Sequence, residues 1–336
     1  MKTLSRSVVA ACLFAASAAS AFAGVTISSP QNQSQVASPF TLSASASNCS
    51  RQNVTSIGYA LDSMSDPGTT SGNSLNVQVS ASAGAHTVYV VAYGAKKATC
   101  VAEVAITVAG APNIPANAVS VSGLQTLSNW IAADDTAGNG TAQGTMSLVG
   151  SPSYGGQALE FATQFTNSGD ERYSVVFGDD TTSANFVWDG WVYLTRSVNK
   201  IANLEMDMNQ VMANGQTVIY GFQCDGNSGT WDYSTNAGTP ESPDDRWVHT
   251  NAACNVQNWR TQKWHHVQIA YSRDESGNVT YQSVWLDGVQ SPVNATAPAA
   301  YALDWGPVLL TNFEIDGEGS SGSSTVYLDD LTVYRW

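Results

Sequence analysis

The chain has 336 residues, a formal net charge of −14 and only 12% charged residues. Its acidic balance disfavours nucleic acids and anionic membranes as partners. The length exceeds what one hydrophobic core usually fills, so we expect two domains. Small polar residues, valine and aromatic residues are abundant, which indicates an all-β extracellular protein.

Residues 1–23 have the features of a secretory signal peptide. Lys2 and Arg6 precede an apolar run from Val8 to Ala19, and Ala21-Phe-Ala23 provides a small-x-small cleavage signal. The run is too short for a membrane anchor, and no other long apolar run follows. We therefore predict a protein secreted to the extracellular space or the periplasm, without a membrane span, and exclude residues 1–23 from the fold.

Four cysteines remain after the signal peptide, an even number in an oxidising compartment. Three pairings are formally possible. We favour Cys49–Cys100 and Cys224–Cys254, because each pair then lies within one domain. A metal site is a weak alternative, since the chain has no Cys-x-x-Cys motif.

Residues 24–110 carry short alternating strands separated by Ser, Gly, Asn and Pro turns. We expect strands at Val25 to Ser28, Phe40 to Ala46, Val54 to Leu61, Ser74 to Val79, His86 to Tyr93 and Cys100 to Val108. This spacing predicts a β-sandwich. The segments 25–30, 57–62 and 83–90 resemble bacterial immunoglobulin-like domains, which implies a spacer role.

Residues 111–118 contain two prolines and form the expected linker. Beyond it, residues 119–336 are again all-β and suit one large sandwich. Three segments resemble laminin-G-like domains: residues 154–161, residues 263–271 with 284–288, and residues 326–334. Their order is similar to that of the concanavalin A-like lectin/glucanase superfamily, which implies a β-jelly roll and leaves the function open.

Residues 203–210 carry the carboxylates and amides that bear most directly on function. Apolar Leu204, Met206 and Met208 alternate with polar Asn203, Glu205, Asp207 and Asn209. This is the period of a strand with one face in a core and the other carrying carboxylates and amides. Such a face can both donate to and accept from sugar hydroxyls.

We therefore predict a lectin-like protein that binds a neutral polysaccharide or oligosaccharide. Residues 217–224 should form a hairpin with this strand, and a long loop closed by Cys224–Cys254 should present tryptophans for stacking on sugar rings. The expected binding residues are Glu205, Asp207, Asn209, Gln210, Gln223, Asp225, Trp231, Asp232, Trp247 and His266.

Residues 205–210 also resemble the active-site strand of family 16 glycoside hydrolases, Glu-x-Asp-x-x-Glu or Glu-x-Asp-x-Glu. The resemblance implies a nucleophile at Glu205 and an electrostatic helper at Asp207. The third position is Gln210 in one register and Asn209 in the other, and an amide has no proton to give to a leaving group. A retaining hydrolase therefore remains the alternative, with Asp225, Asp232 or His266 supplying the acid.

A cell-surface adhesion module is a second alternative, and it predicts a flat apolar patch. No cofactor is required, but Asp329 and Asp330 could hold a structural calcium ion, as related jelly rolls often do.

Overall fold

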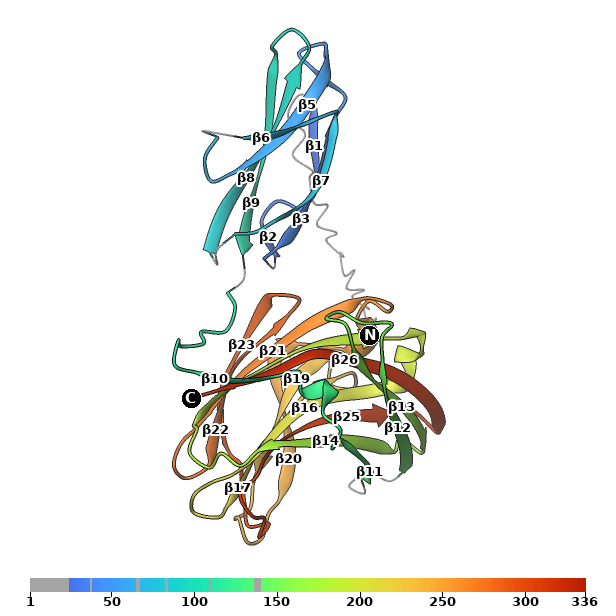
Figure 1. Cartoon of the computed structure of the whole chain (residues 1–336), viewed down its shortest axis with the longest axis vertical. Coiled ribbons are helices and arrows are strands. Elements are labelled where there is room, and N and C mark those ends of the chain that lie inside the picture. The colour runs from blue at the N-terminus through green and yellow to red at the C-terminus, as the bar shows by residue number, and fades with distance from the viewer. Residues whose placement is uncertain (1–23, 37, 65–66, 82–83, 109, 136–139) are drawn as a thin grey trace, which may run out of the picture. The chain divides into compact units, whose positions relative to one another are not determined.

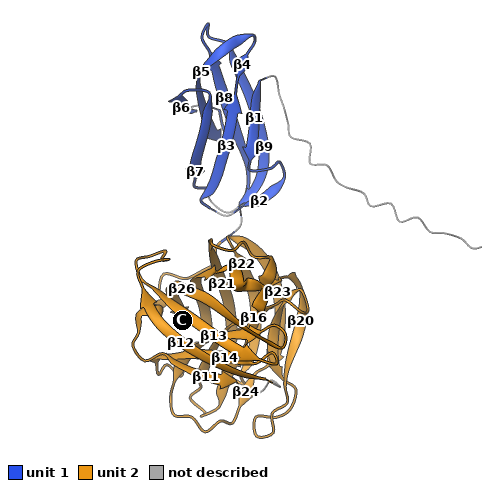
Figure 2. Ribbon diagram, turned by 90° about the vertical axis from the view of Figure 1, so that its right-hand side faces the viewer, with its two compact units in different colours: residues 1–110 blue, residues 111–336 orange. Residues whose placement is uncertain are grey.

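The chain divides into two compact units at residues 110 and 111 (Figure 2). The computed structural model describes residues 24–336 except 37, 65–66, 82–83, 109 and 136–139, so the predicted signal peptide lies outside the described residues. Strands dominate both units, and the described residues form three short 3-10 helices but no α-helix. The all-β prediction is confirmed. No helix in this part of the chain has the length and hydrophobicity to cross a membrane.

The first unit is a β-sandwich (Figure 1). One sheet has the order β1-β3-β7, formed by Val25–Ser29, Phe40–Ala46 and Ser74–Val79. The other has the order β2-β9-β8-β5-β4, with β6 paired to β5; these strands are Ser34–Val36, Thr99–Val108, Gly84–Gly94, Gln52–Leu61, Asn48–Cys49 and Gly68–Ser71. Alternate residues of β3 enter the core, and Cys49 is bonded to Cys100.

The second unit packs two larger sheets face to face. The sheet that we name the β15 sheet has the order β12-β13-β26-β15-β21-β22-β23, with β10 paired to β26. Its strands are Val119–Ser122 (β10), Thr141–Val149 (β12), Ala158–Thr166 (β13), Asn185–Leu194 (β15), Trp264–Arg273 (β21), Asn278–Leu286 (β22), Val289–Pro298 (β23) and Ser321–Arg335 (β26).

The other sheet, which we name the β16 sheet, has the order β11-β14-β25-β16-β18-β19-β20, with β17 paired to β16 and to β24. Its strands are Ile131–Asp135 (β11), Asp170–Gly178 (β14), Ile201–Val211 (β16), Thr217–Tyr220 (β17), Phe222–Asp225 (β18), Thr230–Asn236 (β19), Asp245–Ala253 (β20), Ala300–Tyr301 (β24) and Leu309–Gly317 (β25). The 3-10 helices are Leu124–Thr126 (η1), Arg196–Lys200 (η2) and Val256–Asn258 (η3).

The core of the second unit lies between these two sheets. The indole of Trp188 on β15 donates to the hydroxyl of Thr311 on β25, and the hydroxyl of Tyr271 on β21 donates to the carbonyl of Met206 on β16. Both aromatic side chains are fully buried. These bonds satisfy the polar atoms of large core residues and join the layers.

The expected linker belongs to the second unit. Pro112 is buried, and Ile114 packs against Val187, Ala270 and Trp285 on the β15 sheet. These contacts cover an apolar patch on the face of the β15 sheet that is turned away from the core.

Candidate functional site

Strand β16 divides its side chains between the two faces of the β16 sheet. Leu204, Met206 and Met208 are fully buried in the core between the sheets. Successive side chains of a strand point to opposite faces, so Glu205 and Asp207 project from the other face. We call that face the polar face.

The neighbouring strands extend the polar face on both sides of β16. Glu205 lies opposite Glu314 on β25 and opposite Gln223 on β18. Following the register across the sheet, the residues on the polar face include Asp135, Asp170, Arg172, Ser174, Asn203, Glu205, Asp207, Asn209, Gln223, Asp225, Asp232, Ser234, Trp247, His249, Asn312, Glu314 and Asp316. Carboxylates and amides dominate this set. The apolar Ile131, Ala133, Val176 and Leu310 share the face toward β11.

Three carboxylates converge on the polar face. Glu205, Glu314 and Asp316 each offer an oxygen, and these oxygens lie within 4.8 Å of one another. We call these residues the acidic triad. Each side chain is at most 9% exposed. Two unit charges about 5 Å apart repel by about 3 kcal/mol at an effective dielectric constant of about 20, so the triad disfavours full ionisation.

The pKa values of the triad reflect this crowding. Burial, followed by the charges of Glu314 and Asp316, raises the pKa of Glu205 well above its usual value. Burial and Asp316 raise the pKa of Glu314 to about 10. Burial and Asp170 likewise raise the pKa of Asp316. Without a compensating cation, the triad therefore holds protons at neutral pH.

The carboxylate of Asp207 accepts a backbone hydrogen bond where the neighbouring strand is interrupted. Strands β17 and β18 are interrupted at Gly221, and the backbone N–H of Phe222 donates to the Asp207 carboxylate at 2.8 Å. Burial raises the pKa of Asp207 to about 7, although this hydrogen bond lowers it. Asp207 thus makes a hydrogen bond to the backbone that the alternation of residues 203–209 did not predict.

Gly221 makes room for the side chain of Ser234, next to Trp247. A Cβ atom at residue 221 would lie 2.4 Å from the hydroxyl of Ser234 and 3.4 Å from Cη2 of Trp247. Trp247, on β20, is 37% exposed. An exposed indole therefore lies on the polar face close to buried carboxylate and amide groups.

Several polar atoms on the polar face have no hydrogen-bond partner within the described part of the chain. They are Oδ1 of Asn203, Oδ1 of Asn209, Oε1 of Gln223, Oγ of Ser234 and Oδ1 of Asp316. Buried polar atoms are normally paired, so a group of such atoms on one face requires an explanation.

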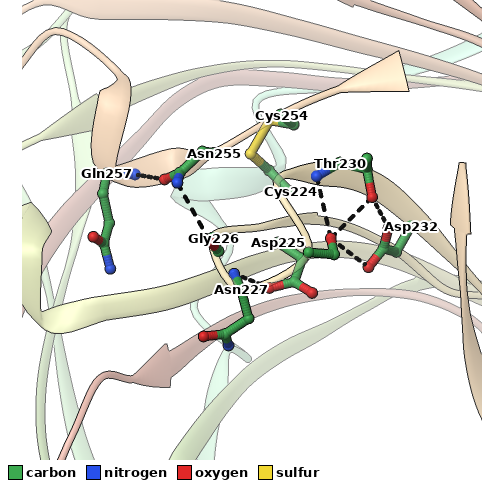
Figure 3. The surroundings of a disulfide bond; sticks show 10 residues. Cys224, Asp225, Gly226, Asn227, Thr230, Asp232, Cys254, Asn255 and Gln257 are labelled. Atoms are coloured by element: carbon green, nitrogen blue, oxygen red, sulfur yellow. Dashed lines mark hydrogen bonds between the residues drawn. A yellow bond between two sulfur atoms is a disulfide. The ribbon is translucent and has the colours of Figure 1, made fainter. Parts of the chain in front are cut away.

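A second acidic group lies toward the edge of the polar face, and Figure 3 shows two of its members, Asp225 and Asp232. Asp225, Asp232 and His249 offer ligand atoms within 4.8 Å of one another. Asp232 is fully buried and accepts hydrogen bonds from the hydroxyls of Ser228 and Thr230 at 3.1 and 2.6 Å. Burial raises the pKa of Asp232, and its carboxylate raises the pKa of the exposed His249 imidazole.

Gln210 does not reach the polar face. It is fully buried, and its amide donates to the carbonyls of Asp180 and Ser183 while its oxygen accepts from Tyr220 and Arg273. The strand has no bulge here, so an even-numbered residue shares the core side with Met208. Asn209 is therefore the third position of the hydrolase-like pattern on the polar face.

Trp231 is a core residue, not a loop residue. It lies on β19, is 1% exposed and stacks on Phe222 with ring centroids 5.4 Å apart. Residues 226–229 form a short turn, so the expected long loop is instead a pair of strands, β19 and β20. The Cys224–Cys254 bond exists, but it joins β18 to the buried residue that follows β20 instead of closing a binding loop (Figure 3).

His266 lies on the other sheet. It belongs to β21, where its ring stacks on Trp191 with centroids 4.4 Å apart and its Nε2 pairs with Asp189 at 2.7 Å. These residues occupy the face of the β15 sheet that is turned away from the core, so His266 is far from the polar face in the layered fold.

The carboxylate of Asp329, on β26, stabilises the loop before β13. Its carboxylate accepts backbone hydrogen bonds from Tyr154, Gly155 and Asp330 and a side-chain bond from Gln125. N–H donors thus surround the oxygens that a calcium ion would need. The structure gives no support to the calcium site expected at Asp329 and Asp330.

Sequence reasoning missed Glu314 and Asp316. The segment Asn312-Phe-Glu-Ile-Asp316 has the same alternation as residues 203–209, with Phe313 and Ile315 in the core. This alternation could be recognised in the sequence. The pairing of the strand, β25, with β16 could not, because it depends on long-range strand order.

Comparison with known proteins identifies no family. No protein-family model and no curated protein match the chain. Among solved structures, it is similar to carbohydrate-binding modules of the β-sandwich superfamily, with 10% identity, a TM-score of 0.34, and 92% of this chain and 96% of that chain covered.

Two other solved structures show a comparable similarity. A xylan-binding domain from Paenibacillus barcinonensis is 15% identical, with a TM-score of 0.29 and coverage of 67% of this chain and 97% of that chain. Arcelin-5, a lectin-like defence protein from Phaseolus vulgaris, is 13% identical, with a TM-score of 0.33 and coverage of 62% and 98%. These scores are too low to assign a family or a function, which must be argued from the site itself.

Proposed function

We propose that this protein is secreted and binds a neutral glycan on the polar face, beside Asp207, Asn209, Gln223 and Trp247. The observation that carries the proposal is the group of buried, unpartnered acceptors on this face, which includes Asn209 Oδ1 and Gln223 Oε1. Sugar hydroxyls are donors that can satisfy such acceptors. The two disulfides are compatible with an oxidising compartment.

Trp247 supplies the apolar contact that a pyranose ring needs. Its indole is partly exposed, and its Cη2 atom lies next to Gly221 and Ser234. A ring stacked there would place its hydroxyls near the carboxylate of Asp207. An indole loses little rotamer freedom on binding, which suits it to such a platform.

The charge of the polar face favours a neutral ligand. Asp135, Asp170, Asp225 and Asp232 add to the acidic triad, whereas Arg172 already bonds Asp135 at 2.6 Å. An anionic polysaccharide would be repelled by this surface.

Affinity electrophoresis through gels that contain a β-glucan, a xylan or a galactan tests the proposal. We expect retardation of the wild type on at least one polymer and about tenfold weaker binding by Trp247→Ala, the loss that corresponds to about 1.4 kcal/mol. Tyr154→Ala is the matched control, because Tyr154 is an exposed aromatic residue outside the polar face. Equal binding by the two variants, or no retardation on any neutral polymer, would contradict the proposal.

Glycoside hydrolysis is the second candidate, because Glu314 supplies a carboxylate that the sequence pattern lacked. Glu314 lies directly opposite Glu205 on β25, and carboxylate oxygens of the two residues come within 4.8 Å of one another, so a second carboxyl group is available beside Glu205. Glu205 would have to be ionised to attack the sugar, although burial raises its pKa as well. Glu314, whose pKa is raised, would protonate the leaving oxygen.

Reducing-sugar release from the same polymers separates the two functions. A hydrolase must release reducing ends at a rate that Glu205→Gln and Glu314→Gln both abolish. If the wild type binds the polymers but releases no reducing sugar at several pH values, carbohydrate binding remains and hydrolysis is excluded.

A further inference from the structure

No basic side chain forms an ion pair with the acidic triad in the described part of the chain, although the charge of Arg172 acts on Glu314. Arg172 lies opposite Glu314 in the register, but its guanidinium is bonded to Asp135. The amide of Asn203 donates to Oδ2 of Asp316 at 3.0 Å and carries no charge. Three carboxyl groups are therefore concentrated on β16 and β25 with no ion pair to a basic side chain among the described residues.

Unpartnered oxygens accompany the triad. Oδ1 of Asp316 is buried without a donor, as is Oε1 of Gln223, the residue opposite Glu205 on β18. Gln223 is 2% exposed. These atoms are acceptors, so a positively charged ligand would satisfy them together with the carboxylates.

We propose that Glu205, Glu314 and Asp316 bind a calcium ion on the polar face. Two ligands that each lie about 2.4 Å from a calcium ion are at most about 4.8 Å apart, and the triad oxygens meet this limit. The donor set contains only oxygen, which suits a hard cation, and the oxygens of Gln223 and water can complete the six to eight ligands that calcium takes. Magnesium is less suitable because it requires a smaller octahedral site and retains several waters.

The second acidic group on the polar face is a weaker candidate. The oxygens of Asp232 already accept from Ser228, Thr230 and His249, and Oδ1 of Asp225 accepts from the backbone of Asn227. Its acceptors are therefore satisfied without a metal ion, unlike those of the acidic triad.

Calcium titration of the chelator-treated full chain tests the proposal without any sugar present. Isothermal titration with CaCl2 at pH 7 should show one calcium ion per chain, and thermal unfolding should shift upward with calcium but much less with MgCl2. Glu314→Gln should weaken calcium binding by at least about tenfold. Because the amide does not titrate, this variant does not bear the cost of keeping residue 314 protonated, so it should unfold at or above the wild-type temperature when no calcium is added.

Asp225→Asn is the matched control, since it changes the second acidic group by the same chemistry. It should keep the wild-type calcium affinity. The proposal is overturned if the wild type shows neither heat of binding nor a calcium-dependent shift. It is equally overturned if binding survives both Glu205→Gln and Glu314→Gln, or if Asp225→Asn abolishes it. The result is independent of the sugar proposal, because no glycan enters the assay.

Discussion

Replacing Glu314 by glutamine should stabilise the cation-free protein at neutral pH. Burial and Asp316 raise the pKa of Glu314 to about 10 in the folded protein, whereas a glutamate in an unfolded chain titrates near pH 4.3. Between these values the unfolded state binds fewer protons than the folded state, so the free energy of unfolding falls as pH rises. The amide of the Glu314→Gln variant does not titrate, so the variant should not lose this part of its free energy of unfolding as pH rises.

The size of the effect follows from the proton that Glu314 retains. One retained proton costs about 1.4 kcal/mol per pH unit, so the wild type should lose about 3 kcal/mol between pH 4.5 and pH 7 through this group. For a unit of this size, about 3 kcal/mol corresponds to about 6–12 °C in Tm. Triad coupling makes this an upper value, because Glu205 and Asp316 share the same protons.

Thermal unfolding followed by circular dichroism in EDTA measures the effect. Wild type and Glu314→Gln should melt at similar temperatures at pH 4.5 and diverge as pH rises to 7, with the variant the more stable. Glu241→Gln, a change at an exposed glutamate, should follow the wild type at both values. A Glu314→Gln protein that is less stable at pH 7, or whose advantage does not depend on pH, would refute the reasoning.

Three other variants test the places of buried residues in the second unit. Trp231→Ala should lower the free energy of unfolding by about 3–5 kcal/mol in urea titrations, because it removes a fully buried indole, while the folded fraction should bind glycan like the wild type. Gln210→Glu should cost about 1–3 kcal/mol in the same assay and create no reducing-sugar release, because it turns an amide donor into an acceptor facing two carbonyls. Joint replacement of Cys224 and Cys254 by Ser should cost about 3–4 kcal/mol, the value for a cross-link that spans 30 residues. Wild-type stability in any of these variants would contradict its assigned place in the core.

Local alternation predicted the strands well because it depends on neighbouring residues. The pattern from Asn203 to Asn209 indicated both the strand and its polar side, and the spacing of Gly, Ser and Pro turns indicated the all-β fold. Gln210 was placed wrongly because the presence or absence of a bulge decides the parity of a residue. That choice depends on pairing with β25, which the sequence of one strand does not contain.

The other errors arose from the arrangement of the sheets. Trp231 follows a Gly- and Asn-rich stretch that indicated a long loop, but the stretch is only a turn between β18 and β19. The strand that contains His266 was predicted correctly. Strand order places it in the β15 sheet, however, so His266 cannot lie on the polar face. Glu314 reaches Glu205 across more than a hundred residues of sequence, a contact that only the tertiary fold creates.

The packing of Ile114 decides where the second unit can be cut from the chain. A fragment that began at residue 119 would contain every strand of both sheets but would lack the side chain that covers Trp285 and Val187. Exposed apolar surface of this kind promotes self-association. A fragment beginning at residue 111 should therefore express as a monodisperse protein, whereas one that begins at residue 119 should aggregate on concentration.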